Sequence, residues 1–444
     1  MPDLQIERIY HQIETELSIF SNQLKKLEVS NYPIKRCQEI IKKLIGKVEA
    51  YKCKIKLILD QKDDNPEEAV RRLITQIHNP LVRQDVKFLD WLRGAQTLNV
   101  PWSFIPCIEH LAQAIIPKHK LLTYCANDYN YGLTWSQSES LAPHPYTVLS
   151  LPRLHRTNVL WHTIIGHELF HPRCVDFIKK HNEKALRRIY TQCEKILRPK
   201  ELEEEHLDQI TKTTHTAWCR AMVELLCDMA CVELFGPAAI LAMRAFSSCS
   251  PTKKMPDPDN NFYPPRLFRF EVVWKYSMDK KKLAAIYSSC PNSDIMDCFK
   301  EEMKSFTNLV SKSEGAALLK EHPLAKIAYG EVNRFLYRAN VFVKRTLPDT
   351  IERWHSPKVL NQIPKLLERL EKGIPPNELV VRINKSAGKE KYETQSAELS
   401  AILIAGWIYE AYWQKKYDQD GEIMPYETMS RLLLKACEDI QFNA

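Results

Sequence analysis

Glycine is scarce in this chain, and its scarcity limits the folds the chain can adopt. Only 11 of the 444 residues are glycine, against 26 prolines. Tight β-turns draw on glycine because it adopts positive backbone φ angles without strain, so a fold rich in such turns is disfavoured. We therefore expect a mainly helical protein of the α+β type, long enough for two or three domains and a sizeable core.

Several targeting signals are also missing. The opening MPDLQIERIYHQIETEL lacks a basic segment followed by an apolar one, which argues against a secretory signal peptide. No apolar run approaches the roughly 18 residues of a membrane-spanning helix, so no membrane partner is expected. The 13 cysteines form no CxxC pair, which favours free thiols in the cytoplasm. Cys227 and Cys231, four residues apart in an apolar segment, are interpreted as core residues.

Strong charge of one sign is missing as well. The net charge of +8 is mild for this length, and basic residues alternate with acidic ones along the chain. The longest purely basic run is Lys280-Lys281-Lys282. A nucleic-acid-binding protein usually concentrates basic charge on one element, so nucleic acid is not expected as a partner.

The remaining texture divides the chain into four segments. Residues 1–118 and 266–444 carry apolar residues at helical spacing and are expected to form N- and C-terminal helical regions. Residues 119–250 are expected to form a catalytic core with a small antiparallel or mixed sheet. Residues 251–265 form a polar, proline-rich loop between the core and the second helical region.

Strand candidates come first within the expected core. HKLLTYCA, NYGLTW and YTVLSLP are short, aromatic and β-branched segments bounded by Asn, Asp, Pro and Ser. A helix capped by Thr157 or Asn158 is then expected to run to about residue 171. Further helices are expected over residues 179–197 and 204–235, the latter ended by Gly236-Pro237.

The stretch WHTIIGHELFHPRC, residues 161–174, contains the HExxH pattern. His167 and His171 are four residues apart, so on a helix they share a face and can hold one metal ion. Zinc bound by three protein ligands keeps a position for water, whose proton Glu168 can accept. The alternative is a pair of structural histidines that fall one helical turn apart by chance.

A third ligand is available downstream. In AMVELLCDMACVELFG, Glu224 and Asp228 share a face of an otherwise apolar helix, where carboxylates are rarely buried without a partner or a metal. Glu233 falls about 180° away from Glu224 and is expected to face solvent. The alternative for Glu224 is a buried salt bridge, for instance to Arg220.

Together, His167-Glu168-x-x-His171 and Glu224-x-x-x-Asp228 resemble the gluzincin group of zinc metallopeptidases. The resemblance covers about residues 119–270, and the layout is also similar to uncharacterised bacterial HExxH proteins. It implies a zincin-like core with zinc ligands His167, His171 and Glu224, and Glu168 as the catalytic base. It also implies that Asp228 orients a ligand histidine, and that the YTVLSLP strand forms the edge of a substrate cleft.

Two points depart from this pattern or leave it incomplete. Pro172 directly follows His171, which predicts that the helix kinks or ends there. The group also needs an oxyanion-stabilising residue, for which NNFYPPRLFRF offers Tyr263 and Arg266. The alternative for this loop is a proline-fixed turn with Arg266 in a surface ion pair.

The residues favour a zinc-dependent metallopeptidase that hydrolyses peptide bonds through a metal-bound water. Its expected partners are a protein or peptide substrate and a regulatory protein. The first alternative is a catalytically inactive helical binding or regulatory protein, in which the site is a structural zinc staple or vestigial. The second is a nucleic-acid regulator, which no helix-turn-helix or zinc-finger spacing supports.

Overall fold

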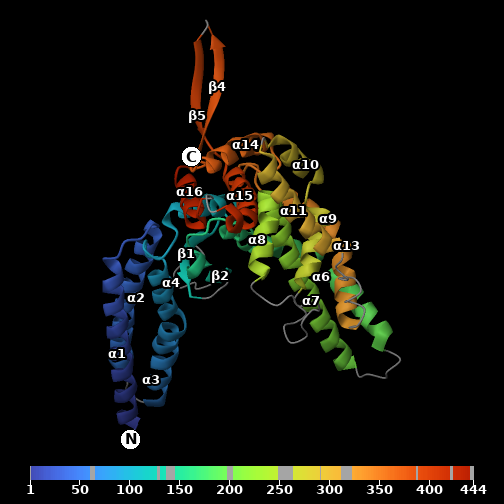
Figure 1. Ribbon diagram of the computed structural model, residues 1–444. Coiled ribbons are helices and arrows are strands. Elements are labelled where there is room, and N and C mark those ends of the chain that lie inside the picture. Colours follow the sequence, from blue (N-terminus) through green and yellow to red (C-terminus); the bar gives the residue numbers. More distant parts are fainter. Residues whose placement is uncertain are drawn as a thin grey trace. The chain divides into compact units, whose positions relative to one another are not determined.

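The computed structural model describes residues 2–60, 66–127, 131–136, 146–197, 204–248, 264–290, 292–311, 323–386, 389–420 and 424–440. These residues are mainly helical, with two small sheets (Figure 1). They form two compact units, residues 1–105 with 118–156 and residues 106–117 with 157–444. The predicted core of residues 119–250 is therefore divided between the two units. Among the described helices, none is both long and apolar enough to cross a bilayer.

The first unit contains the predicted N-terminal helices. Helix α1 (Pro2–Glu28) packs against α2 (Lys35–Asp60) and α3 (Pro66–Leu73). Two π-helical turns then lead into α4 (Val86–Gly94), which packs on strand β1. Asp85 is fully buried and accepts hydrogen bonds from Lys47 at 2.7 Å and from Tyr51 at 2.8 Å.

The first unit also contains a three-stranded mixed sheet. Strands β1 (Lys120–Ala126), β2 (Gly132–Ser136) and β3 (Tyr146–Pro152) lie in the order β1-β3-β2. The β1-β3 pair is parallel and the β2-β3 pair antiparallel. All three predicted strands are confirmed. Because β3 belongs to the first unit and the HExxH segment to the second, the cleft-edge role of β3 stays a prediction.

Helix α6 in the second unit corrects the expected helix boundaries. A 3₁₀ turn over Trp161–Ile164 leads into α6 (Ile165–Leu197), which continues through Pro172. The prediction of a separate helix ending at about residue 171 was therefore wrong. Proline in a helix interior costs roughly 3 kcal/mol because one hydrogen bond is lost. Burial of α6 against α7 and α13 offsets that cost.

Helix α7 (Glu204–Phe235) is buried most completely over its last three turns, where every side chain of residues 225–235 is buried. It ends as predicted at Gly236, whose φ of +53° favours glycine, and Pro237 opens α8 (Pro237–Ser248). A side chain at position 236 would also meet the Trp354 ring, 2.3 Å from the ideal Cβ position. This glycine therefore sets both the helix end and the packing of Trp354.

In the part of the second unit that the structure describes, the remaining elements are helices and one hairpin. Strands β4 (Glu378–Ser386) and β5 (Lys389–Ser396) pair antiparallel, so the prediction of helices alone over residues 266–444 was wrong there. The run LVVRI and the following SAG carried a hairpin signal. The helices are α5 (Ile105–Ile115), α9 (Arg266–Tyr276), α10 (Lys280–Ser289), α11 (Ser293–Ser311), α13 (Pro323–Thr346), α14 (Pro357–Glu371), α15 (Leu399–Asp420) and α16 (Tyr426–Glu438).

Candidate metal centre

The HExxH residues lie where the start of α6 packs against α7. Gly166 makes this approach possible, because a Cβ there would lie 2.8 Å from the Phe235 ring and 3.4 Å from Leu234. His167 and Glu168 follow directly and are only 6% and 9% exposed. Ionisable side chains at such depth need partners, and α7 supplies them.

His167 has a carboxylate at each ring nitrogen. Its Nδ1 lies 2.8 Å from Asp228 Oδ1, and its Nε2 lies 3.5 Å from Glu224 Oε2. Two zinc ligands at about 2.0–2.2 Å from the metal in a tetrahedron are roughly 3.3–3.6 Å apart. The Nε2–Oε2 separation therefore fits two ligands of one ion. Asp228 meanwhile fixes the ring from behind, an arrangement common around zinc-binding histidines.

His171 and Glu168 are the other two HExxH residues that α6 contributes to the site. The rings of His167 and His171 have centroids 5.0 Å apart and lie nearly perpendicular, at 80°. Glu168 Oε2 lies 3.7 Å from His171 Nε2. The Glu168 carboxylate is thus beside the histidines and can accept a proton from a group bound between them.

A second possible ligand, Cys227, competes with Glu224. Among the described residues, the ligand atoms of His167, His171 and Cys227 lie within 4.8 Å of one another, and Glu224 is not part of this group. Yet Cys227 Sγ is fully buried and 3.5 Å from Cys174 Sγ, with which it shares a hydrogen bond. Burial raises the pKa of this thiol well above its ordinary value. We favour Glu224, because its carboxylate is already charged and reaches His167 Nε2 directly.

Arg269 on α9 is the site residue that the sequence did not reveal. Its Nε and Nη2 donate to the two oxygens of Asp228 at 2.6 and 2.7 Å, and its Nη1 lies 3.1 Å from Glu224 Oε2. Of the residues expected in this segment, Tyr263 lies outside the described part of the chain. Arg266 is the first residue of α9, one turn before Arg269, and its role stays a prediction. The salt bridge of Glu224 is thus made to Arg269.

The paired charges shift each other's pKa values. Burial alone would lower the pKa of His167, but its hydrogen bonds to Asp228 and Glu224 and their charges raise it to about 10. Burial would raise the pKa values of both carboxyls, but Arg269 and His167 hold them below their ordinary range. Two cations thus balance two carboxylates inside the cluster. His167 must release a proton before its Nε2 can coordinate a metal.

The other two motif residues respond mainly to burial. Burial and the neighbouring charge of His167 lower the pKa of His171 to about 4, so this imidazole is neutral at pH 7 and ready to act as a ligand. Burial also raises the pKa of Glu168. A raised pKa is what a carboxylate needs to accept a proton near neutral pH.

Glu233 corrects another expectation from the sequence. It is 2% exposed rather than facing solvent, and its Oε1 lies 3.1 Å from both Arg353 and His355. Helical spacing placed it opposite Glu224, but α7 is covered on both sides. A position opposite a buried face is solvent-exposed only when the helix lies at the surface.

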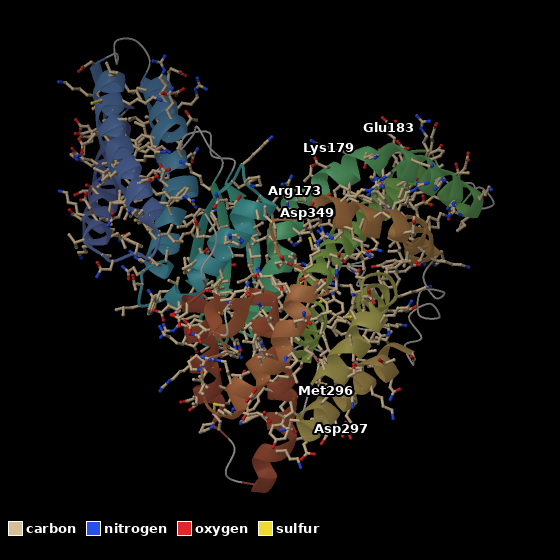
Figure 2. The ribbon with its side chains drawn as sticks, turned by 90° about the horizontal axis from the view of Figure 1, so that it is seen from above. Arg173, Lys179, Glu183, Met296, Asp297 and Asp349 are labelled. Carbon is tan, nitrogen blue, oxygen red and sulfur yellow. The ribbon has the colours of Figure 1, made fainter. Side chains whose placement is uncertain are left out.

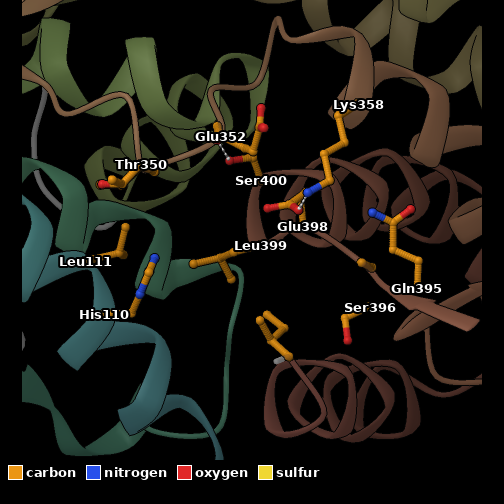
Figure 3. Close-up of a pocket in the computed structure, with 13 residues that line it drawn as sticks. His110, Leu111, Thr350, Glu352, Lys358, Gln395, Ser396, Glu398, Leu399 and Ser400 are labelled. Carbon is orange, nitrogen blue, oxygen red and sulfur yellow. Dashed lines mark hydrogen bonds and ion pairs between the residues drawn. The ribbon is translucent and has the colours of Figure 1, made fainter. Parts of the chain in front are cut away.

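A separate cavity of about 420 Å³ lies in the second unit, beside the start of α15 (Figure 3). Lys358 and Glu398 form an ion pair across it at 2.5 Å. The Ser400 hydroxyl contacts the backbone carbonyls of Leu234 and Glu352, each at 3.1 Å. Because these carbonyls engage the hydroxyl, we assign Ser400 to anchoring α15 rather than to nucleophilic chemistry.

Comparison of the chain with models of protein families, with curated proteins and with solved structures finds no significant match.

Proposed function

We propose that the protein is a zinc-dependent metallopeptidase with His167, His171 and Glu224 as the zinc ligands. The observation that carries the proposal is the setting of His167. Its Nδ1 is held by Asp228 at 2.8 Å while its Nε2 faces Glu224 at 3.5 Å. One ring nitrogen anchored by a carboxylate and the other directed at a second ligand is the arrangement that catalytic zinc sites use.

The chain's own residues have separate roles in this proposal. Zinc, when bound, would lower the pKa of water and polarise the scissile carbonyl. Glu168 accepts the proton of the attacking water, whose oxygen bonds to the carbonyl carbon. It then delivers that proton to the amide nitrogen as the C–N bond breaks. Arg269 acts as a positioning residue, because it holds Glu224 and Asp228 in place through three nitrogen–oxygen contacts of 3.1 Å or less.

The test is hydrolysis of a mixture of fluorogenic peptides by the purified, zinc-loaded chain. We expect Glu168→Gln to lose nearly all activity, on the order of 100-fold or more, while zinc content is unchanged. Glu183→Gln is the matched control, because it makes the same change at an exposed carboxylate of the same helix. Full activity in Glu168→Gln would end the proposal.

One observation favours a second candidate function, a structural zinc site in a binding protein. Cys227 lies within 4.8 Å of both histidine ligand atoms, and a thiolate ligand would suit a closed coordination sphere. In that case Cys227→Ser would release zinc and destabilise the fold. Glu168→Gln would then leave every biological effect intact, since a structural site has no use for a general base.

A further inference from the structure

Two helix segments of the second unit each carry more basic than acidic residues. Residues 176–188 of α6 and helix α13 together carry ten Lys and Arg and three Asp and Glu. One of the three carboxylates, Glu331, is fully buried. Helix α2 in the first unit has a similar excess, with eight Lys and Arg and three Asp and Glu, so basic charge alone does not single out these two segments.

The two segments lie side by side in the second unit, α6 in green and α13 in orange in Figure 2. They pack through an aromatic seam in which the rings of Phe177 and His181 meet that of Phe335 at centroid distances of 6.4 and 5.1 Å. Figure 2 shows Lys179 and Glu183 on the outer side of α6. Basic residues of both helices therefore border one packing contact, although their positions differ by about 150 residues.

The cations that flank this packing contact are Lys180, Lys184 and Arg188 of α6 with Arg334 and Arg338 of α13, which we call the basic seam. Burial, and then the charges of Arg338, Lys180 and Lys184, lower the pKa of His181 beneath them. Cations from both helices thus act on one buried ring, which places them around the same point. Their positive charges add to the effect of burial in disfavouring a protonated His181.

Two carboxylates of the described residues lie near the seam: exposed Glu183, 3.7 Å from Arg187, and buried Glu331. Buried Glu331 accepts a hydrogen bond from Arg188 at 3.0 Å and lies 3.6 Å from Arg334. One negative charge is shared between two arginines, so the remaining positive charge faces outward. Arg338 lies over the Phe335 ring at 5.7 Å, which holds its guanidinium at the surface of the seam.

An exposed aromatic side chain accompanies the seam. Tyr337 is 72% exposed, between Arg334 and Arg338 in the sequence. An exposed ring among arginines is a stacking platform for nucleobases, whereas an acidic peptide has no use for it. The cations of α13 run from Lys326 to Arg345, about 28 Å along the helix. That length matches roughly eight stacked nucleotides.

We propose that the basic seam, together with Tyr337, binds single-stranded nucleic acid through its phosphates and one stacked base. The surface is separate from the metal ligands, so this binding does not depend on the proposed peptidase activity. The sequence argued against nucleic acid because no basic run exceeds three residues. A run of basic residues in the sequence could not reveal the basic seam, because the seam combines residues of two helices that are far apart in the sequence.

The test is fluorescence anisotropy of a labelled 20-nucleotide single strand, titrated with the full chain between 50 and 300 mM salt. We expect the triple variant Lys180→Ala, Lys184→Ala, Arg338→Ala to bind at least about tenfold more weakly. The slope of log affinity against log salt should become shallower by about 2, for three lost phosphate contacts. This variant keeps the Arg188–Glu331 pair, so it leaves no buried charge without its partner.

The matched control replaces Lys280, Lys281 and Lys282 with alanine, an equal charge loss in the longest basic run of the sequence, and binding should stay nearly unchanged. Tyr337→Ala should weaken binding about tenfold with the salt slope intact, and Tyr337→Phe should restore it. Glu224→Ala should bind as the wild type does.

Three outcomes would overturn the proposal. Equal losses in the two triple variants would mean that the seam is not a distinct binding surface. Equally strong competition by polyglutamate, charge for charge, would point to an acidic protein as the partner. Tighter binding of a duplex than of the single strand would remove the role assigned to Tyr337. Circular-dichroism melting curves that match the wild type confirm that each variant is folded.

Discussion

Two stretches of helix α6 place charged side chains in opposite settings. At its start, His167 and Glu168 are 6% and 9% exposed and are surrounded by groups of balancing charge from α7 and α9. In the middle of the helix, Lys179, Lys180 and Lys184 are exposed to solvent. The first stretch is a closed, charge-balanced cluster, and the second is an open surface with more basic than acidic residues.

This difference in burial determines whether the loss of a charged group affects folding or binding. In the buried cluster every group has a named partner, so the loss of one leaves another stranded in a low-dielectric setting. On the basic seam Lys180, Lys184 and Arg338 are exposed to solvent, so the loss of one of them changes binding to anions far more than folding. The variants below test this contrast, beginning with the largest expected effect.

Arg269→Ala should lower the free energy of unfolding of the metal-free protein by about 3–5 kcal/mol, because it strands the buried carboxylates Glu224 and Asp228. The measurement is urea unfolding at pH 7 with a chelator present. Arg187→Ala, at an exposed position of α6, is the control and should change the free energy of unfolding by no more than about 0.5 kcal/mol. Similar losses in the two variants would break the comparison.

Gly166→Ala should destabilise the fold by about 1–3 kcal/mol, because the new methyl group meets the Phe235 ring where α6 packs against α7. Gly330→Ala makes the same change at an exposed position of α13, where nothing lies within 4 Å of the added Cβ. It should stabilise the protein by about 0.5–1 kcal/mol, since alanine is the better helix former. Thermal unfolding of the two variants measures whether each substitution raises or lowers stability. A destabilised Gly330→Ala would contradict the assignment of an open surface at this position.

Glu410 offers a further comparison, because it is a half-buried carboxyl whose described hydrogen bond comes from neutral Gln414 at 2.6 Å. Burial raises its pKa from the ordinary 4.5 to about 7, whereas Arg269 and His167 lower the pKa values of Glu224 and Asp228. The folded state therefore holds the Glu410 proton more tightly than the unfolded state does. Its contribution to stability is complete below pH 4.5 and is lost as the pH rises through 7.

Glu410→Gln should remove this dependence. The difference in unfolding free energy between wild type and variant should change by about 1–2 kcal/mol between pH 4.5 and pH 7.5, with the wild type losing stability as pH rises. Urea unfolding of both proteins at those two pH values gives the difference. A wild type that gains stability relative to Glu410→Gln over this range would show that Glu410 is ionised in the fold.

The sequence located the cluster's α6 and α7 residues because their spacing is local. Four-residue intervals put His167 beside His171 and Glu224 beside Asp228, whatever the rest of the fold does. Arg269 could not be found in the same way, since it lies on a third helix, 41 residues after Asp228 in the sequence. The sequence pointed to the correct segment through Arg266 but offered no reason to prefer the residue one turn later.

Tertiary packing explains the expectations that were wrong. The local preference of Pro172 to end a helix was overridden by burial of α6 against two neighbours. Glu233 was expected at the surface because its spacing was known but the number of helices around α7 was not. The basic seam was missed for the same reason, because residues 180–188 and 334–338 become neighbours only in the folded chain.

The most direct test of the central claim is zinc-edge X-ray absorption of the purified, zinc-loaded chain, with metal content measured beside it. The account predicts one zinc per chain, bound only by nitrogen and oxygen at about 2.0–2.2 Å, and a lower zinc content in Glu224→Ala but not in Cys227→Ser. A sulfur ligand at about 2.3 Å would replace Glu224 with Cys227 and favour a structural site. Failure of the chain to bind zinc at all would contradict the account outright.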